Sequence, residues 1–220
     1  MMLRFFAASL SILVTTLISL GGVGAVNATG EGNSPDIDLP PPSGQGRVVL
    51  ILSGMDGTGP YKEYAEKIAG LGYYAVVIDG RDIFSADQKG GDRLQKAITR
   101  AFASSNALAG KVAVIGFSAG GGGALAYAER QPDAVSAVIA YYPATSFIAE
   151  MSDMKSFVGK FQVPALVFAG GKDTFDNCCL LATATEMETT AKHPSLGSAA
   201  RAACAASRSA VLPNPACAAD

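Results

Sequence analysis

Short apolar runs alternate with helical patterns along most of this chain, and this alternation limits the possible folds more than any other feature. The apolar runs are rich in β-branched residues and occupy 47–53, 74–79, 112–117, 135–141 and 165–169. The helical patterns between them occupy 61–70, 92–103, 121–129 and 152–158. Continuous apolar runs are typical of strands buried on both faces, and helical crossovers between strands build parallel sheets. We therefore predict an α/β fold with a mostly parallel sheet of about five strands and helices on both faces.

One motif stands between the third predicted strand and the helix after it. Gly116, Phe117, Ser118, Ala119 and Gly120 form a G-x-S-x-G sequence in that context. A strand that turns directly into a helix holds the central serine in a strained conformation, and its neighbours Gly116 and Gly120 must be small. The geometry would point Ser118 Oγ into a cleft, where the helix N-terminus favours negative charge. We predict that Ser118 is a nucleophile; the competing interpretation is a glycine-rich turn that only packs a helix on the sheet.

A serine nucleophile needs hydrogen-bond donors for the oxyanion, and it needs an acid to orient its base. The N–H of Ala119 is one expected donor. The loop after the first strand supplies the other, from Met55 or alternatively from Asp56. The acid should follow a later strand, and Asp173 comes shortly after the run at 165–169. The alternative for Asp173 is a helix N-cap or turn residue.

Composition and spacing argue against several other functions. The net charge is −2 and the basic residues are scattered, which does not favour nucleic-acid binding. The glycines at 54–59 are spaced G-x-x-G-x-G, unlike the G-x-G-x-x-G of dinucleotide sites. The four cysteines and one histidine fit no zinc motif. We therefore expect no metal and no organic cofactor, and the oligomeric state stays open.

The N-terminus has the pattern of an export signal. Arg4 precedes an apolar or small run that ends in Val26, Asn27 and Ala28, residues that suit signal peptidase. We predict a signal peptide over 1–28, a secreted or periplasmic protein and no stable membrane association. An uncleaved membrane anchor is the alternative, because the 22 residues at 5–26 could just cross a hydrocarbon core of about 30 Å. Residues 29–46 are rich in Gly, Pro and Asp, which predicts a flexible lead-in.

Export would also permit disulfides. The cysteines are Cys178, Cys179, Cys204 and Cys217. Because neighbouring cysteines bond to each other only with strain, we expect any bridge to join Cys178 or Cys179 to Cys204 or Cys217.

Four segments of the chain together fit one known pattern. They are Ser53-Gly54, GFSAGG at 116–121, Tyr141-Tyr142-Pro143 and GGKDTFDNCC at 170–179. Over roughly residues 47–192 the chain resembles the dienelactone hydrolase group of α/β-hydrolases. Some members use a cysteine nucleophile; Ser118 takes that position here. The resemblance implies hydrolysis of a carboxylic ester or lactone through an acyl-enzyme, with Ser118 as nucleophile and Asp173 as orienting acid.

The region around the only histidine departs from that pattern. The family places its histidine on a loop after one further strand, whereas residues 174–191 are predicted as one helix that leads to His193. A helix of roughly fourteen residues ends about 20 Å from its start, whereas a hydrogen bond to Ser118 Oγ needs roughly 3 Å. His193 is the candidate base only if this helix is broken or the tail folds back. The alternative is an exposed histidine at a helix C-terminus.

The last segment, 193–220, is an atypical tail. Ten of the 26 residues at 195–220 are alanine, and none is aromatic. We predict that the last strand and the histidine loop are missing, and we ascribe the loss to a frameshift or divergence near Lys192. An α/β-hydrolase domain would then cover 47–192, and hydrolysis would be impaired.

Two other functions remain open at this point. The first is a catalytically inactive α/β-hydrolase-fold protein that serves in binding or interaction. The second is acyl transfer or peptide hydrolysis by the same triad. For the hydrolase, we expect a small-molecule ester or lactone with a modest apolar acyl or aromatic group, held near Met55, Tyr61, Tyr142, Phe147 and Phe175.

Overall fold

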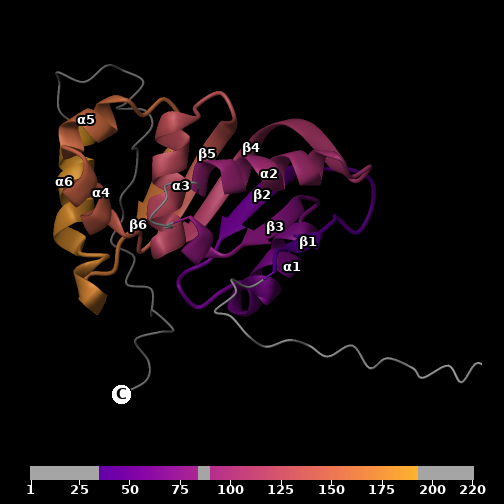
Figure 1. The fold of residues 1–220 in the computed structure, drawn as a ribbon, viewed down its shortest axis with the longest axis horizontal. Coiled ribbons are helices and arrows are strands. Elements are labelled where there is room, and N and C mark those ends of the chain that lie inside the picture. Colours follow the sequence, from indigo (N-terminus) through magenta and orange to yellow (C-terminus); the bar gives the residue numbers. More distant parts are fainter. Residues whose placement is uncertain (1–34, 84–89, 193–220) are drawn as a thin grey trace, which may run out of the picture. The chain divides into compact units, whose positions relative to one another are not determined.

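The computed structural model describes residues 35–83 and 90–192. A six-stranded sheet runs through them in the order β1-β3-β2-β4-β5-β6 (Figure 1). The strands are β1 (Ile37–Leu39), β2 (Gly46–Leu52), β3 (Tyr74–Ile78), β4 (Ala107–Phe117), β5 (Val135–Tyr141) and β6 (Ala165–Phe168). β1 pairs antiparallel with β3, and all the other neighbours are parallel. The predicted fold class, a mostly parallel α/β sheet, is confirmed.

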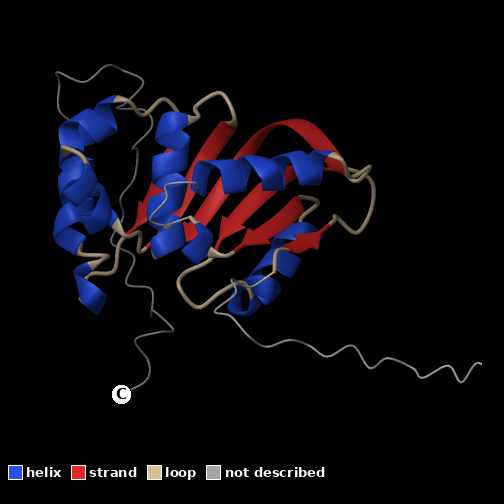
Figure 2. Cartoon of the chain, in the orientation of Figure 1, coloured by secondary structure: helices blue, strands red, loops and turns tan. Residues whose placement is uncertain are grey.

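Helices cover both faces of this sheet (Figure 2). They are α1 (Lys62–Gly70), α2 (Gly90–Phe102), α3 (Ala119–Arg130), α4 (Thr145–Met151), α5 (Met154–Gly159) and α6 (Leu181–Ala191). Alternate residues of β2 divide the core: Leu50 packs with α2 and α3, whereas Ile51 packs with α1. α2 buries Leu94, Ala97, Ile98 and Ala101, the spacing that places one helix face against a sheet.

The lead-in contains a strand that its composition did not predict. β1 lies within 29–46, and ion pairs of Asp36 and Asp38 join this segment to α2. Asp36 pairs with both Arg93 and Arg100, and Asp38 lies 2.9 Å from Arg100 Nε. The expectation of a flexible segment was wrong for residues 37–39, because acidic residues that suggested solvation have arginine partners far along the chain.

The predicted helix over 174–191 was also wrong in its first third. A short 3-10 turn, η3 (Phe175–Asn177), precedes α6. Asp176 and Asn177 have φ of 46° and 53°, in the left-handed region that an α-helix cannot continue through. α6 therefore begins at Leu181, after an irregular turn.

The remaining predictions on the two ends of the chain fall outside the described residues. These are the signal peptide at 1–28, His193, the tail at 193–220 and the cysteines Cys204 and Cys217. β6 is the last strand within residues 90–192 and forms one edge of the sheet. None of the helices that the structure describes is long and apolar enough to span a membrane.

Candidate active site

Ser118 occupies the turn between β4 and α3. Its backbone has φ of 51° and ψ of −117°, a conformation that costs a non-glycine residue about 1–3 kcal/mol. Three backbone hydrogen bonds hold it: the Ser118 N–H donates to Tyr141 O at 3.0 Å, and Ser118 O accepts from the N–H groups of Gly122 at 3.1 Å and Ala144 at 3.0 Å. The strained strand-to-helix turn that the motif predicts is therefore present.

The two glycines of the motif are needed for close backbone approach. A Cβ on Gly116 would overlap the carbonyl of Gly120, and a Cβ on Gly120 would overlap the carbonyl of Ser53 at the end of β2. The N–H of Gly120 donates to that same Ser53 carbonyl at 3.1 Å. α3 thus begins in direct contact with β2, which fixes the position of Ser118 relative to the loop after that strand.

That loop lies beside the nucleophile. A Cβ on Gly54 would lie 3.7 Å from Ser118 Cβ, and the Gly54 N–H is already donated to Tyr61 Oη at 3.0 Å. Ala119 is the first residue of α3, so its N–H has no carbonyl one turn earlier in the helix to bond to. Met55 follows Gly54, and its side chain is 59% exposed. Both residues thus remain our predicted oxyanion donors, with Asp56 as the alternative for Met55.

Two partly buried tyrosines lie beside this loop. Burial raises the pKa of Tyr61, and the neighbouring negative charge of Asp56 raises it further. Burial likewise raises the pKa of Tyr142, with smaller contributions from Asp56 and Asp173. Both hydroxyls therefore stay protonated at neutral pH and act as hydrogen-bonding groups rather than as bases. Tyr61 and Tyr142, both predicted near the substrate, are brought together here.

Aromatic rings continue from these tyrosines across the carboxyl ends of three strands. The ring of Phe117 lies 4.8 Å from that of Tyr61 and stacks on Tyr141 at 4.9 Å. Tyr141 stacks in turn on Phe168 of β6 at 4.9 Å. The row was not predicted as a unit, because the register that sets Phe117 beside Tyr141 and Tyr141 beside Phe168 is not visible in any one segment.

Asp173 lies in the loop after β6, at the edge where the sequence placed it. It is partly buried, and its Oδ1 accepts the N–H of Phe175 at 3.1 Å. This hydrogen bond is the turn role that we considered as the alternative. The charge of Asp173 also raises the pKa of Tyr142 slightly, so its carboxylate lies near that tyrosine, at the same edge of the sheet as Ser118. The catalytic role of Asp173 stays a prediction.

The hydroxyl of Ser118 contacts sulfur rather than nitrogen. Ser118 Oγ lies 3.7 Å from Cys179 Sγ. Cys178 and Cys179 are bonded to each other, so the expectation that they bridge to Cys204 or Cys217 was wrong. Its premise was the strain of a vicinal bond, yet the turn before α6 holds both side chains together in one buried cluster with Ala144.

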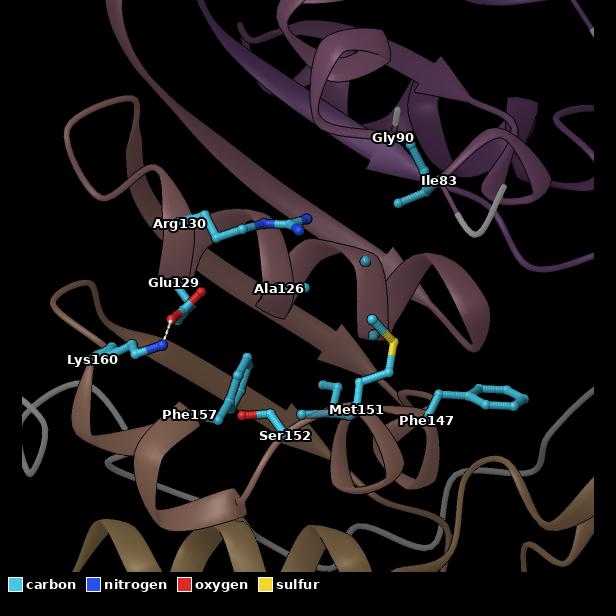
Figure 3. Close-up of a pocket in the computed structure, with 13 residues that line it drawn as sticks. Ile83, Gly90, Ala126, Glu129, Arg130, Phe147, Met151, Ser152, Phe157 and Lys160 are labelled. Atoms are coloured by element: carbon cyan, nitrogen blue, oxygen red, sulfur yellow. Dashed lines mark ion pairs between the residues drawn. The ribbon is translucent and has the colours of Figure 1, made fainter. Parts of the chain in front are cut away.

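The predicted substrate residues divide between two places. A cavity of about 400 Å³ lies beside α3, α4 and α5, with Phe147 on its rim (Figure 3). Ser118 does not line it, although Gly122 of the same helix does, and the Glu129–Lys160 ion pair of 3.3 Å lies at its other end. Phe147 therefore lines this cavity. Phe175 is 63% exposed and lies on the loop after β6 that carries Asp173, which we call the acid loop. No cluster of possible metal ligands occurs in the described part of the chain.

Solved structures with the same fold include two bacterial proteins. Est1E from Butyrivibrio proteoclasticus has a TM-score of 0.56 at 15% identity, covering 70% of this chain and 79% of its own. A proposed dienelactone hydrolase from Klebsiella pneumoniae has a TM-score of 0.54 at 16% identity, covering 71% and 79%. No curated protein matches this chain. The sequence pattern of the dienelactone hydrolase family matches residues 38–195, and the chain therefore belongs to that family.

Proposed function

We propose that this hydrolase cleaves a carboxylic ester or lactone through an acyl-enzyme on Ser118. The observation that carries the proposal is the strained turn at Ser118, which is held by three backbone hydrogen bonds and by the contact between Gly120 and β2. A serine held in this way at a helix N-terminus is the arrangement that acyl transfer requires. Export to the periplasm or the cell exterior is part of the proposal, and the disulfide suits such an oxidising compartment.

The chemistry follows in two steps. Ser118 Oγ attacks the carbonyl carbon, and the N–H groups of Met55 and Ala119 stabilise the oxyanion of the tetrahedral intermediate. The alcohol leaves with a proton, and water then attacks the acyl-enzyme to release the acid and regenerate Ser118. Asp173 orients the base, for which His193 is the candidate. We expect slow turnover, because the sequence around His193 departs from the family pattern.

An aromatic acyl group is the substrate feature that the surroundings favour. Three aromatic residues lie next to the loop after β2 that carries Met55, which we call the oxyanion loop. They are Tyr61, Phe117 and Tyr142. Est1E, one of the structures with the same fold, is known with ferulic acid bound. Aromatic side chains hold a flat acyl group by offset stacking, with ring centroids about 4.5–7 Å apart.

Covalent trapping tests the proposal. A fluorophosphonate should label intact protein at Ser118, and the label should be absent from the Ser118→Ala variant. Ser146→Ala is a matched control, because Ser146 Oγ is buried without a hydrogen-bond partner in the described residues. If intact protein is neither labelled nor able to hydrolyse short aryl esters, the hydrolase proposal is wrong.

A catalytically inactive binding protein is the second candidate. It is favoured by one observation, namely that the neighbour of Ser118 Oγ is the Cys179 sulfur, which cannot act as a base while it is in the disulfide. In that case an aromatic ester should bind near Ser118 and remain uncleaved. Binding of such an ester with unchanged affinity to Ser118→Ala, together with no phosphonate labelling, would support this function over hydrolysis.

A further inference from the structure

The Cys178–Cys179 disulfide directly follows the loop that carries Asp173, and it lies beside the nucleophile. Both cysteines are buried, at 6% and 3% exposure, whereas residues 174–177 immediately before them are exposed. The only polar contact of Ser118 Oγ among the described residues is Cys179 Sγ at 3.7 Å. The disulfide thus lies against the hydroxyl of the candidate nucleophile.

A ring of contacts ties this disulfide to the backbone of Ser118. The Ala144 N–H donates to Ser118 O at 3.0 Å, and two residues later the Ser146 N–H donates to Cys178 O at 3.1 Å. The ring closes where Cys179 Sγ meets Ser118 Oγ. The start of α4 is therefore hydrogen-bonded both to the backbone of Ser118 and to the backbone of Cys178.

The turn that contains the disulfide is also hydrogen-bonded to the acid loop. The Cys178 N–H donates to Phe175 O at 3.0 Å, and the Phe175 N–H donates to Asp173 Oδ1 at 3.1 Å. On the far side, Thr183 Oγ1 is 2.6 Å from Thr145 Oγ1 and donates to Leu180 O at 2.9 Å. The loop is otherwise exposed and contains two residues with positive φ. The acid loop is therefore joined through the backbone of Cys178 to the turn that the disulfide closes.

We propose that the Cys178–Cys179 disulfide is a positioning element for Ser118 and Asp173, and that its reduction slows acyl transfer at Ser118. The inference rests on the function proposed above. In the disulfide, the sulfur beside Ser118 carries no proton and is only a weak acceptor, so the lone pairs of Oγ remain available for attack. In the reduced form a thiol can donate to Oγ, the two sulfurs separate, and the turn at residues 178–179, which follows the acid loop, is free to relax.

The redox step is balanced by an external dithiol. The dithiol transfers two electrons and two protons: the S–S bond breaks, Cys178 and Cys179 each gain an S–H, and the dithiol closes to a cyclic disulfide. Reoxidation by a small disulfide reverses the step. A displacement of about 1 Å can lower a rate by about a hundredfold, and we expect a loss of about tenfold or more in the rate of Ser118 labelling.

The experiment uses the full chain with Cys204→Ser and Cys217→Ser, so that only the 178–179 pair can respond. Peptide mass spectrometry first establishes whether Cys178 and Cys179 are bonded to each other. Fluorophosphonate labelling of Ser118 is then followed over a range of reagent concentrations in the oxidised, dithiol-reduced and reoxidised protein. Circular dichroism checks that each form is folded. The matched control is the same chain with Cys178→Ser and Cys179→Ser.

We expect the maximal labelling rate to fall on reduction and to return on reoxidation, with little change in the concentration for half-maximal rate. The control should label slowly and ignore the dithiol. Equal rates in the oxidised and reduced forms would overturn the inference and leave the proposed function standing. So would a dithiol effect that persists in the control, or peptides showing that the two cysteines are not bonded to each other. Absence of labelling in every form would overturn the proposed function and the inference with it.

Discussion

The two sides of the candidate site are built in different ways. Ser118 lies between a strand and a helix, and its backbone groups are bonded to Tyr141, Gly122 and Ala144. Asp173 lies in an exposed loop in which Asp176 and Asn177 have positive φ. Regular elements thus fix the nucleophile, whereas a turn hydrogen bond and a disulfide hold the acid side. The difference indicates that the backbone of Ser118 keeps its conformation under local changes that would displace the carboxylate of Asp173.

The largest expected effect comes from the acid side. Asp173→Asn keeps an oxygen that can accept the Phe175 N–H, so the turn should survive while the charge is lost. If Asp173 orients the base, kcat should fall by about a thousandfold or more, because a neutral amide favours the wrong tautomer of a histidine. The measurement is hydrolysis of a short aryl ester. Asp176→Asn, in the same exposed loop, is the control and should retain activity; equal activity of the two variants would leave Asp173 with the turn role alone.

The next effect concerns the rigidity of the nucleophile side. In Gly120→Ala the new methyl group overlaps the carbonyls of Ser53 and Leu52. Because these are backbone atoms, β2 and α3 must separate, and we expect a loss of about 3 kcal/mol in the free energy of unfolding. Urea denaturation measures this loss. Gly171→Ala on the acid loop is the matched control, since its Cβ would meet nothing within 4 Å. If both variants are equally stable, the contrast between the two sides is wrong.

A smaller effect is expected at Tyr61, which supports the oxyanion loop. Tyr61→Phe removes the acceptor of the Gly54 N–H, which should cost about 1 kcal/mol. The folded protein also raises the pKa of Tyr61 by burial. Its contribution to stability is therefore present below the ordinary tyrosine pKa of about 10 and is lost as the pH rises above that value, where the unfolded chain ionises first.

The free energy of unfolding, measured at pH 8 and above pH 10, tests whether the contribution of Tyr61 to stability is lost at high pH. The wild-type protein should lose more stability over that interval than Tyr61→Phe does. Tyr73→Phe is the control, because Tyr73 is largely exposed, and it should behave like the wild type. A steeper loss in Tyr61→Phe than in the wild type would show that the hydroxyl is not protected by the fold.

The parallel sheet and the turn at Ser118 could be predicted from the sequence, because each depends on residues that are close together in the chain. The apolar run at 112–117 is followed at once by the glycines and by a helix, so strand, turn and helix are all indicated within about twenty residues. Gly120 approaches Ser53, which is distant in sequence. The glycine at position 120 nevertheless indicates such a contact, because only a residue without a Cβ lets another backbone come that close.

Other features depend on partners that are distant in sequence. Asp36 and Asp38 suggest a solvated segment until Arg93 and Arg100 are placed beside them. The turn before α6 has helix-forming residues around it, and only tertiary structure reveals the left-handed conformations of Asp176 and Asn177. The contact of Cys179 with Ser118 likewise joins residues 61 positions apart, which no local pattern could indicate.

The position of β1 has a consequence for the order in which the chain can assemble. β1 pairs with β3 and not with β2, the strand that follows it, and its acidic neighbours pair with Arg93 and Arg100 on α2. A ribosome makes the N-terminal residues first, yet residues 36–39 gain these partners only after the chain has reached Arg100. β1 therefore cannot gain its partners while it is being made, and this edge of the sheet is complete only after β3 and α2 have followed it.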